Sequence, residues 1–125
     1  MPRILDHIDL RVPDLQAARG FYEKLLPMLG FTKPADIPGW ISYNAEGDGP
    51  TEFFGFVESP GHQPNENRIA FWVESNEAVE AFFPLLQKIG AINIEGPCFE
   101  DLDYYAIFFD DPFGNRLEVC HRARN

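Results

Sequence analysis

The stretch DDPFGNRLEVC, residues 110–120, decides the fold because it joins a tight turn to a strand whose two faces differ in chemistry. Asp111 stands at the first corner of the turn, Pro112 has a preset backbone angle, and Gly114 can adopt a positive φ. In the strand that follows, Glu118 stands between a leucine and a valine. A carboxylate is costly to bury unless a partner meets it. The stretch therefore raises the question of what Glu118 binds.

The residues on either side of this turn predict the second half of the chain. The segment RIAFWV is typical of a strand, and the helical segment after it stops before Gly90, a residue that favours a helix end. We expect strands over 68–73, 91–95, 104–109 and 115–121, a helix over 77–89, and a loop over 96–103.

The first half of the chain follows the same plan. The segment ILDHIDLRV alternates between apolar and polar residues, which indicates a strand with one buried face. Asp14 is the expected cap of the helix that follows, Pro27 is expected to end it, and Gly30 is a plausible stop. We expect strands over 4–12, 40–45 and 51–58, a helix over 15–26, and at most a short strand in the proline-rich segment 30–40.

The two halves can be overlaid, which indicates an internal duplication. Ile8, Leu10 and Val12 fall on a second set of apolar residues, and the helices coincide. That second set is Ile69, Phe71 and Val73. Each half therefore reads strand–helix–strand–strand–strand, which predicts an α+β protein of two modules, residues 4–58 and 68–121, within one domain of residues 1–125.

Composition excludes several classes of function. The formal net charge is −10, and such a surface repels phosphate backbones, so we expect no nucleic-acid partner. No apolar run approaches the length of a membrane span, and the N-terminus lacks the apolar core of a signal peptide, so we expect a cytoplasmic protein with no membrane partner. Cys98 and Cys120 lack the spacing of a metal site and are expected to be reduced thiols.

The overlay also places chemistry on one face. His7 falls on Arg68, and both have the parity opposite to the residues that pack under the helices. The same parity applied to the last strand puts Glu118 on this face. We therefore expect His7, Arg68 and Glu118 to lie on a common concave face if the sheets curve around one cleft.

These residues resemble the vicinal oxygen chelate superfamily, which contains glyoxalase I, extradiol dioxygenases, and fosfomycin- and bleomycin-resistance proteins. The marks of the resemblance are LDHIDLRVPDL, FYEKLLPMLGF, RIAFWV and YYAIFFDDPFGNRLEV, and they cover almost the whole chain. The resemblance implies paired βαβββ modules in tandem, curved mixed sheets that enclose a cleft, a divalent metal ion in the enzymes of the family, and homodimers.

The resemblance also implies which positions hold the metal. His7 matches the first-strand histidine and Glu118 the last-strand glutamate, which gives both a catalytic and a metal-binding role. Arg68 stands where the family has a histidine before Ile-Ala-Phe. Phe54 lies near the fourth position and is no ligand, although a shift of two residues brings in Glu52 as a third ligand.

The sequence leaves two interpretations of Glu118 open, a metal ligand or the partner of an arginine. A catalytic divalent site generally needs three protein ligands, and His7 and Glu118 are only two; Glu52 is a possible third ligand for a zinc, nickel, iron or manganese ion, and His62 is a further candidate. Arginine stays protonated and repels a cation, and Arg68 would more naturally form a bidentate ion pair with Glu118. We favour the guanidinium over the metal ion.

Two functions follow from these readings. The first is a glyoxalase/bleomycin-resistance-like binding protein that holds a small aromatic or carboxylate-bearing molecule in the cleft, beside an incomplete metal site. The expected ligand-binding residues are Arg68, Arg11, Trp40, Phe54, Phe56 and Trp72. The alternative is a metal-dependent lyase, isomerase or dioxygenase that acts on a substrate with vicinal oxygens.

Overall fold

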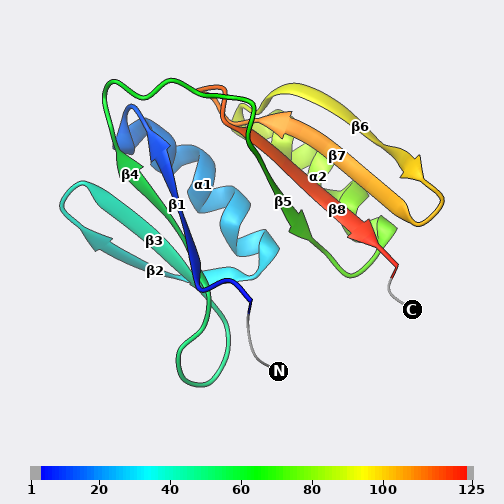
Figure 1. The fold of residues 1–125 in the computed structure, drawn as a ribbon, viewed down its shortest axis with the longest axis horizontal. Coiled ribbons are helices and arrows are strands. Elements are labelled where there is room, and N and C mark those ends of the chain that lie inside the picture. The colour runs from blue at the N-terminus through cyan, green and yellow to red at the C-terminus, as the bar shows by residue number, and fades with distance from the viewer. Residues whose placement is uncertain (1–3, 124–125) are drawn as a thin grey trace. The chain divides into compact units, whose positions relative to one another are not determined.

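The computed structural model describes residues 4–123, which form two compact units divided between Gln63 and Pro64. The first unit contains β1 (His7–Val12), α1 (Leu15–Leu29), β2 (Phe31–Ile37), β3 (Trp40–Ala45) and β4 (Phe53–Glu58) (Figure 1). The second contains β5 (Arg68–Trp72), α2 (Asn76–Ile89), β6 (Ile92–Asp101), β7 (Tyr104–Asp110) and β8 (Arg116–Arg122).

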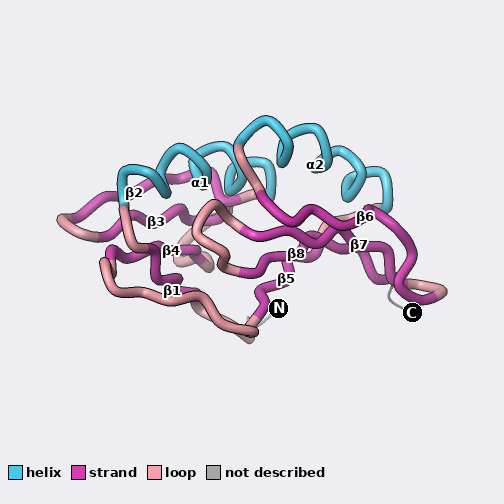
Figure 2. Tube along the Cα trace, turned by 90° about the horizontal axis from the view of Figure 1, so that it is seen from above, coloured by secondary structure: helices cyan, strands magenta, loops and turns pink. Residues whose placement is uncertain are grey.

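Each unit has a four-stranded mixed sheet, and the strand orders of the two sheets correspond. The orders are β1-β4-β3-β2 and β5-β8-β7-β6. The first and last strands of each unit pair in parallel, and the other neighbours are antiparallel. In each unit one helix covers one face of the sheet and leaves the other face, called here the open face, without a helix (Figure 2). The predicted α+β class with two βαβββ modules is confirmed.

The core of each unit lies between its helix and its sheet. In the first unit, one stripe of α1 packs on the sheet, and Val12 of β1 is fully buried, as the alternation of that strand predicts. In the second unit, Leu117 and Val119 of β8 are fully buried beneath α2, while Glu118 between them belongs to the open face. Full burial of one large apolar side chain contributes about 1.5–3 kcal/mol, so these stripes hold the helices on the sheets.

The helix ends follow local chemistry, with one correction. Asp14 caps α1 by accepting a hydrogen bond from the Ala17 amide at 3.1 Å, and Gly30, at φ 107°, ends the helix. Pro27 does not end α1, because it lies in the last turn, where its missing N–H removes only one helical hydrogen bond. The helix α2 ends at Gly90 as predicted. Neither helix of residues 4–123 has the length and apolar character needed to cross a membrane.

Two strands are longer than the sequence predicted. β2 runs through Pro34, which is tolerated because β2 is an edge strand whose outer N–H groups need no ladder partner. β6 continues to Asp101 through most of the segment predicted as a loop, and its pairing with β7 shifts register three times. This irregular, exposed pairing explains why the segment has no clear strand pattern.

The turn between β7 and β8, residues 111–114, forms as predicted. Asp111 is fully buried, and its carboxylate accepts hydrogen bonds from the amides of Phe113 and Asn115, both at 2.9 Å, and from the Asn115 side chain at 2.9 Å. Gly114 has φ 96°, a left-handed conformation that favours glycine. The turn thus fixes the register between β7 and β8, and with it the cross-strand neighbours of Glu118.

Candidate functional site

The open face of the second unit carries Glu118, which is only 4% exposed. Its neighbours in the sheet are Ala70 on β5 and Phe108 on β7. Arg68 has the same parity on β5, so Arg68 and Glu118 share a face. Glu118 lies on β8, one of the two central strands of the sheet, where water has little access.

Tyr104 is the partner of Glu118. The hydroxyl of Tyr104 on β7 donates a hydrogen bond to the Glu118 carboxylate. Burial, together with this hydrogen bond and the Glu118 charge, raises the pKa of Tyr104 above its ordinary value. Burial and the same carboxylate also raise the pKa of the Cys120 thiol. The phenol therefore stays protonated and remains a donor to Glu118.

Arg68 does not pair with Glu118, and this part of the prediction is wrong. The Arg68 guanidinium lies over the Phe108 ring, 4.8 Å from its centroid. In register, Arg68 stands beside Arg116, whereas Glu118 stands beside Ala70, one pleat further along the sheet. Within residues 4–123, Arg68 takes part in no ion pair. The Phe108 ring, and not the Glu118 carboxylate, thus contacts the Arg68 guanidinium.

A second arginine is stacked in the same way at the other end of β8. The Arg122 guanidinium lies 4.0 Å from the centroid of the Tyr104 ring. Trp72 is 45% exposed, and its indole N–H donates to the Arg122 carbonyl at 3.2 Å. Trp72 shares the parity of Arg68 on β5, as predicted. The two stacked arginines can be compared, because Arg68 lines the pocket described next and Arg122 does not line that pocket.

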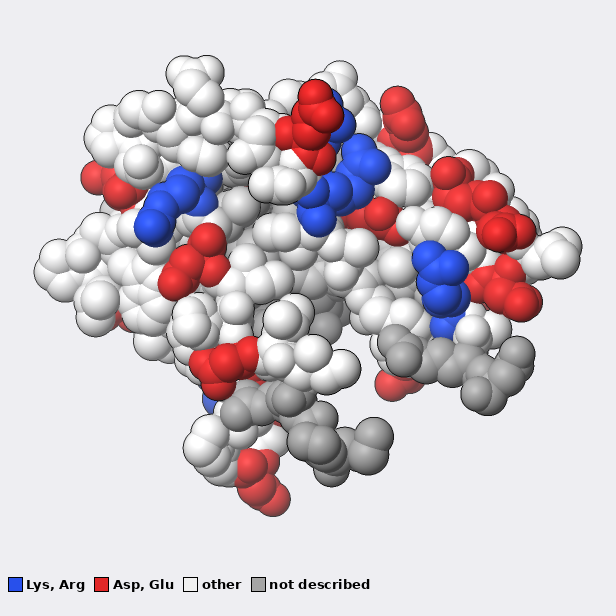
Figure 3. Space-filling model, in the orientation of Figure 1, with Lys and Arg blue, Asp and Glu red and all other residues white. Residues whose placement is uncertain are grey.

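A pocket of about 270 Å³ opens beside Arg68. Its lining combines two arginines, Arg68 and Arg116, with two carboxylates, Glu95 and Asp110, above the ring of Phe108. Basic side chains lie where β5 and β8 begin, next to acidic ones (Figure 3). Sequence reasoning missed Arg116 and Phe108. Correct register across the β7–β8 hairpin would have placed both on the face of Glu118.

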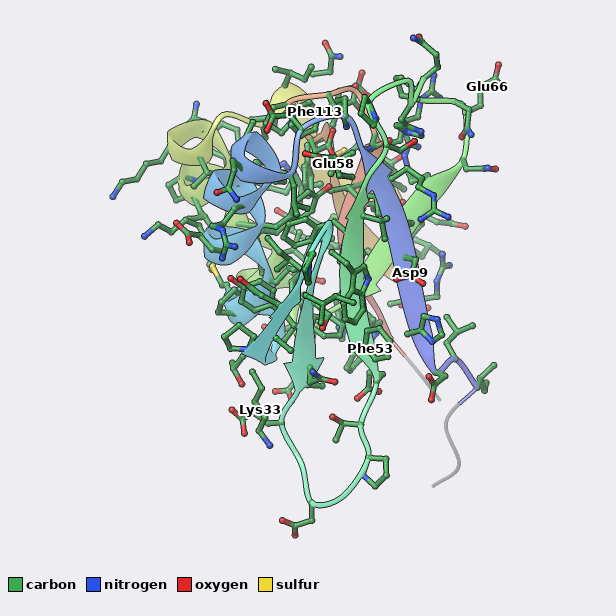
Figure 4. The ribbon with its side chains drawn as sticks, turned by 90° about the vertical axis from the view of Figure 1, so that its left-hand side faces the viewer. Asp9, Lys33, Phe53, Glu58, Glu66 and Phe113 are labelled. Atoms are coloured by element: carbon green, nitrogen blue, oxygen red, sulfur yellow. The ribbon has the colours of Figure 1, made fainter. Side chains whose placement is uncertain are left out.

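The open face of the first unit is built around His7. Its ring stacks on Phe53, with centroids 4.5 Å apart and planes 2° apart. Its Nδ1 lies 2.9 Å from a carboxylate oxygen of Asp6, and its Nε2 lies 3.5 Å from Asp9. Figure 4 shows Asp9 and Phe53 projecting from neighbouring strands, away from α1. Both ring nitrogens of His7 therefore face acidic side chains of its own unit.

Phe54 and Phe56 do not face the open side, contrary to the prediction. They are 1% and 0% exposed, and both rings stack against Tyr22 of α1, at centroid distances of 5.8 and 5.0 Å. Phe53 takes the open face instead, because it stands level with His7 in the β1–β4 register. The segment TEFFGFVE has aromatic residues of both parities, so its pattern does not identify the buried set.

The other predicted site residues of the first unit are Trp40, Arg11 and Glu52. Trp40 edges against Phe53 and donates its indole N–H to Asp9 at 3.0 Å, which places it on the open face as expected. Arg11 is exposed and has the parity of His7. Glu52 precedes β4, where its carbonyl accepts a hydrogen bond from Ala45. Phe53, rather than Glu52, is the residue beside His7.

These donors do not fit a divalent metal ion within either unit. The two nitrogens of His7 face carboxylates, Glu118 holds a phenol, and Arg68 brings a positive charge to the position that the resemblance gives to a histidine. Among residues 4–123, neither unit gathers three His, Cys, Asp or Glu side chains able to hold a metal ion. The open faces of the two units present guanidinium, carboxylate and aromatic groups.

The chain matches a known protein superfamily in sequence and solved structures in fold. The profile of the Glyoxalase/Bleomycin resistance protein/Dioxygenase superfamily matches residues 4–119. A glyoxalase/bleomycin resistance protein from Albidiferax ferrireducens is 26% identical, with a TM-score of 0.79 over 97% of this chain and 100% of that one. No curated protein sequence matches.

A fosfomycin resistance protein from Listeria monocytogenes shares the fold at 18% identity, with a TM-score of 0.73 over 98% of this chain and 96% of that one. A glyoxalase/bleomycin resistance protein/dioxygenase family enzyme from Burkholderia phytofirmans shares the fold at 17% identity, with a TM-score of 0.72 over 94% of this chain and 98% of that one. Both chains are covered almost fully, so the likeness extends to both units.

Proposed function

Because the chain belongs to the glyoxalase/bleomycin resistance protein/dioxygenase superfamily, we propose that it binds a small carboxylate-bearing molecule, with Arg68 as the carboxylate anchor. The proposal includes an aromatic or other flat body for that molecule, which exposed aromatic side chains on the open face of the second unit would contact. In this proposal the two units act as one domain of a cytoplasmic homodimer.

The observation that carries the proposal is the contact between Arg68 and Phe108. A guanidinium over a ring, at 4.8 Å from the centroid, is held in one orientation by the ring quadrupole. Its N–H groups lie in the guanidinium plane and point outward, a geometry that matches a carboxylate bidentately. Since no described carboxylate pairs with Arg68, a ligand carboxylate would supply the missing partner. Such a charge-assisted pair contributes about 1.5–3 kcal/mol, or roughly 10- to 150-fold in affinity.

Benzoate and its neutral isostere benzamide test the anchor. We expect titrations followed by NMR to show binding of benzoate and at least tenfold weaker binding of benzamide. Arg68→Gln should remove this preference, and Arg68→Lys should restore part of it, because lysine supplies the charge without the fork. Arg122→Gln is the matched control, since Arg122 is also stacked on a ring but lies outside the pocket. Equal binding of the two probes, or an unchanged preference in Arg68→Gln, would reject the anchor.

A separate measurement tests the metal-dependent alternative. The protein is purified without added metal, analysed for its elements, and titrated with nickel, zinc, iron and manganese ions. We expect no stoichiometric metal, because the donors of each unit already face other groups. Stoichiometric binding that disappears in His7→Ala would instead favour the metal-dependent lyase, isomerase or dioxygenase. Sedimentation of the same sample reports whether the chain is a dimer.

A further inference from the structure

The pocket beside Arg68 has charges of opposite sign on opposite sides. Its basic residues, Arg68 and Arg116, lie on the paired strands β5 and β8 and are register neighbours. Its acidic residues, Asp110 and Glu95, lie on β7 and β6. Phe108 lines the pocket between the basic and the acidic residues, and it is the register neighbour of Glu95 across β6 and β7. Positive charge therefore lines the pocket on the side of β5 and β8, and negative charge lines it on the side of β7 and β6.

These four charged groups do not neutralise one another. Among residues 4–123 no ion pair joins either arginine to either carboxylate, although Asp110 and Arg116 are cross-strand neighbours. One carboxylate oxygen of Asp110 accepts from the side-chain amide of Asn93 at 2.9 Å, which holds the group at the pocket wall. The arrangement leaves two cations and two anions around one pocket, in which a molecule with the reverse charge order would be stabilised at both ends.

We propose that this pocket binds a small zwitterion of the amino-carboxylate class. Its carboxylate lies against Arg68 and Arg116, and its ammonium lies against Glu95 and Asp110. A volume of about 270 Å³ is at the small end of ligand pockets, which suits a single amino acid rather than a peptide. The inference rests on the proposed function, because Arg68 is the carboxylate anchor in both, and it adds the ammonium side and a second arginine.

The test compares amino acids with the same skeletons lacking the amino group. L-Alanine, L-leucine and L-phenylalanine are titrated by NMR beside propanoate, 4-methylpentanoate and 3-phenylpropanoate. We expect at least one amino acid to bind about three- to tenfold more tightly than its des-amino partner, since each exposed ion pair adds a modest gain. Phenethylamine, which lacks the carboxylate, should bind more weakly than L-phenylalanine. Added salt should reduce the amino acid preference.

Three variants assign the two sides of the pocket. Glu95→Gln should weaken the preferred amino acid about two- to fivefold and leave its des-amino partner unchanged. Arg116→Gln should weaken both by about tenfold. Glu100→Gln is the control, because Glu100 lies on the same strand β6 outside the pocket and should change neither.

The outcomes separate this inference from the proposed function. If a des-amino acid binds as tightly as its amino acid and Glu95→Gln changes neither, the zwitterion is rejected while the carboxylate anchor stands. If neither an amino acid nor a des-amino acid binds, and Arg68→Gln changes nothing, both proposals fail. If phenethylamine binds as well as L-phenylalanine, the carboxylate has no role in the pocket and both fail as well.

Discussion

The Tyr104 hydroxyl donates to the carboxylate of Glu118 across β7 and β8, and this contact satisfies an acid that is 4% exposed on the open face of the second unit. The glutamate that the family resemblance marks as a metal ligand thus has a protein donor. A phenol O–H and a metal ion both bind the lone pairs of a carboxylate, so the Tyr104 hydroxyl would compete with a metal ion for Glu118.

Removing this donor should destabilise the protein. Tyr104→Phe leaves a buried carboxylate without its hydroxyl partner, and we expect a loss of about 1–3 kcal/mol in the free energy of unfolding. Urea denaturation at pH 7 measures the loss. Tyr105→Phe is the matched control, because its hydroxyl donates to the exposed Glu80 and its removal should change stability by less than about 0.5 kcal/mol. Equal losses in the two variants would contradict the prediction.

The stabilising effect of Tyr104 should disappear in alkali. Its pKa is raised in the folded protein, so the unfolded chain releases this proton at a lower pH than the folded protein does. The contribution of Tyr104 is therefore fully present below about pH 10, the ordinary tyrosine value, and decreases as the pH rises above it. Urea denaturation from pH 7 to 11 should show the advantage of the wild type over Tyr104→Phe shrinking above pH 10. A constant difference over this range is the result that would count against it.

The turn before β8 should depend on one carboxylate. Asp111 is fully buried and accepts two backbone amides and one side-chain amide, so Asp111→Ala leaves several donors unsatisfied. We expect a loss of about 2–4 kcal/mol in thermal or urea unfolding. Asp101→Ala is the control, because exposed Asp101 also accepts a backbone amide, from Leu102 at 2.8 Å. Its loss should stay below about 1 kcal/mol, and a similar cost for both would show that burial of the turn is unimportant.

Gly55 and Gly20 should respond oppositely to alanine. A Cβ at Gly55 would lie 2.8 Å from the Trp40 indole nitrogen and 2.9 Å from an Asp9 oxygen, so Gly55→Ala has to break the hydrogen bond between them. A Cβ at Gly20, within α1, meets nothing within 4 Å. We expect Gly55→Ala to lower stability and change Trp40 fluorescence, and Gly20→Ala to raise stability by about 0.5–1 kcal/mol. If Gly55→Ala leaves the fluorescence unchanged, Trp40 is not held against Asp9.

The parts of the structure that sequence reasoning predicted are those set by local chemistry. The alternation of β1, the Asp14 cap, the glycines after both helices and the Asp111 turn each depend on residues close in sequence. These features can be predicted from the sequence because their hydrogen bonds form within a few residues and do not depend on the pairing of distant strands.

The parts that were wrong depend on pairing between distant strands. Shared parity and the family position of Arg68 predict its pairing with Glu118, but neither gives the level along the sheet, and one pleat separates the two residues. The family resemblance places Phe54 on the open face, and the segment itself does not correct this, because Phe53, Phe54 and Phe56 present aromatic residues of both parities. Only the pairing of β1 with β4 shows that Phe53 lies beside His7. Tyr104, Phe108 and Arg116 were missed for the same reason.

The equal strand orders of the two units also bear on how the chain is made. Every strand pairing of the described residues joins strands of the same unit. The parallel contact of His7 with Phe53 requires nearly the whole first unit, but nothing beyond it. During synthesis the first sheet can therefore close while the residues of the second are still inside the ribosome. The aromatic and acidic face of the first unit would then be in place before the sheet that carries both pocket arginines has closed.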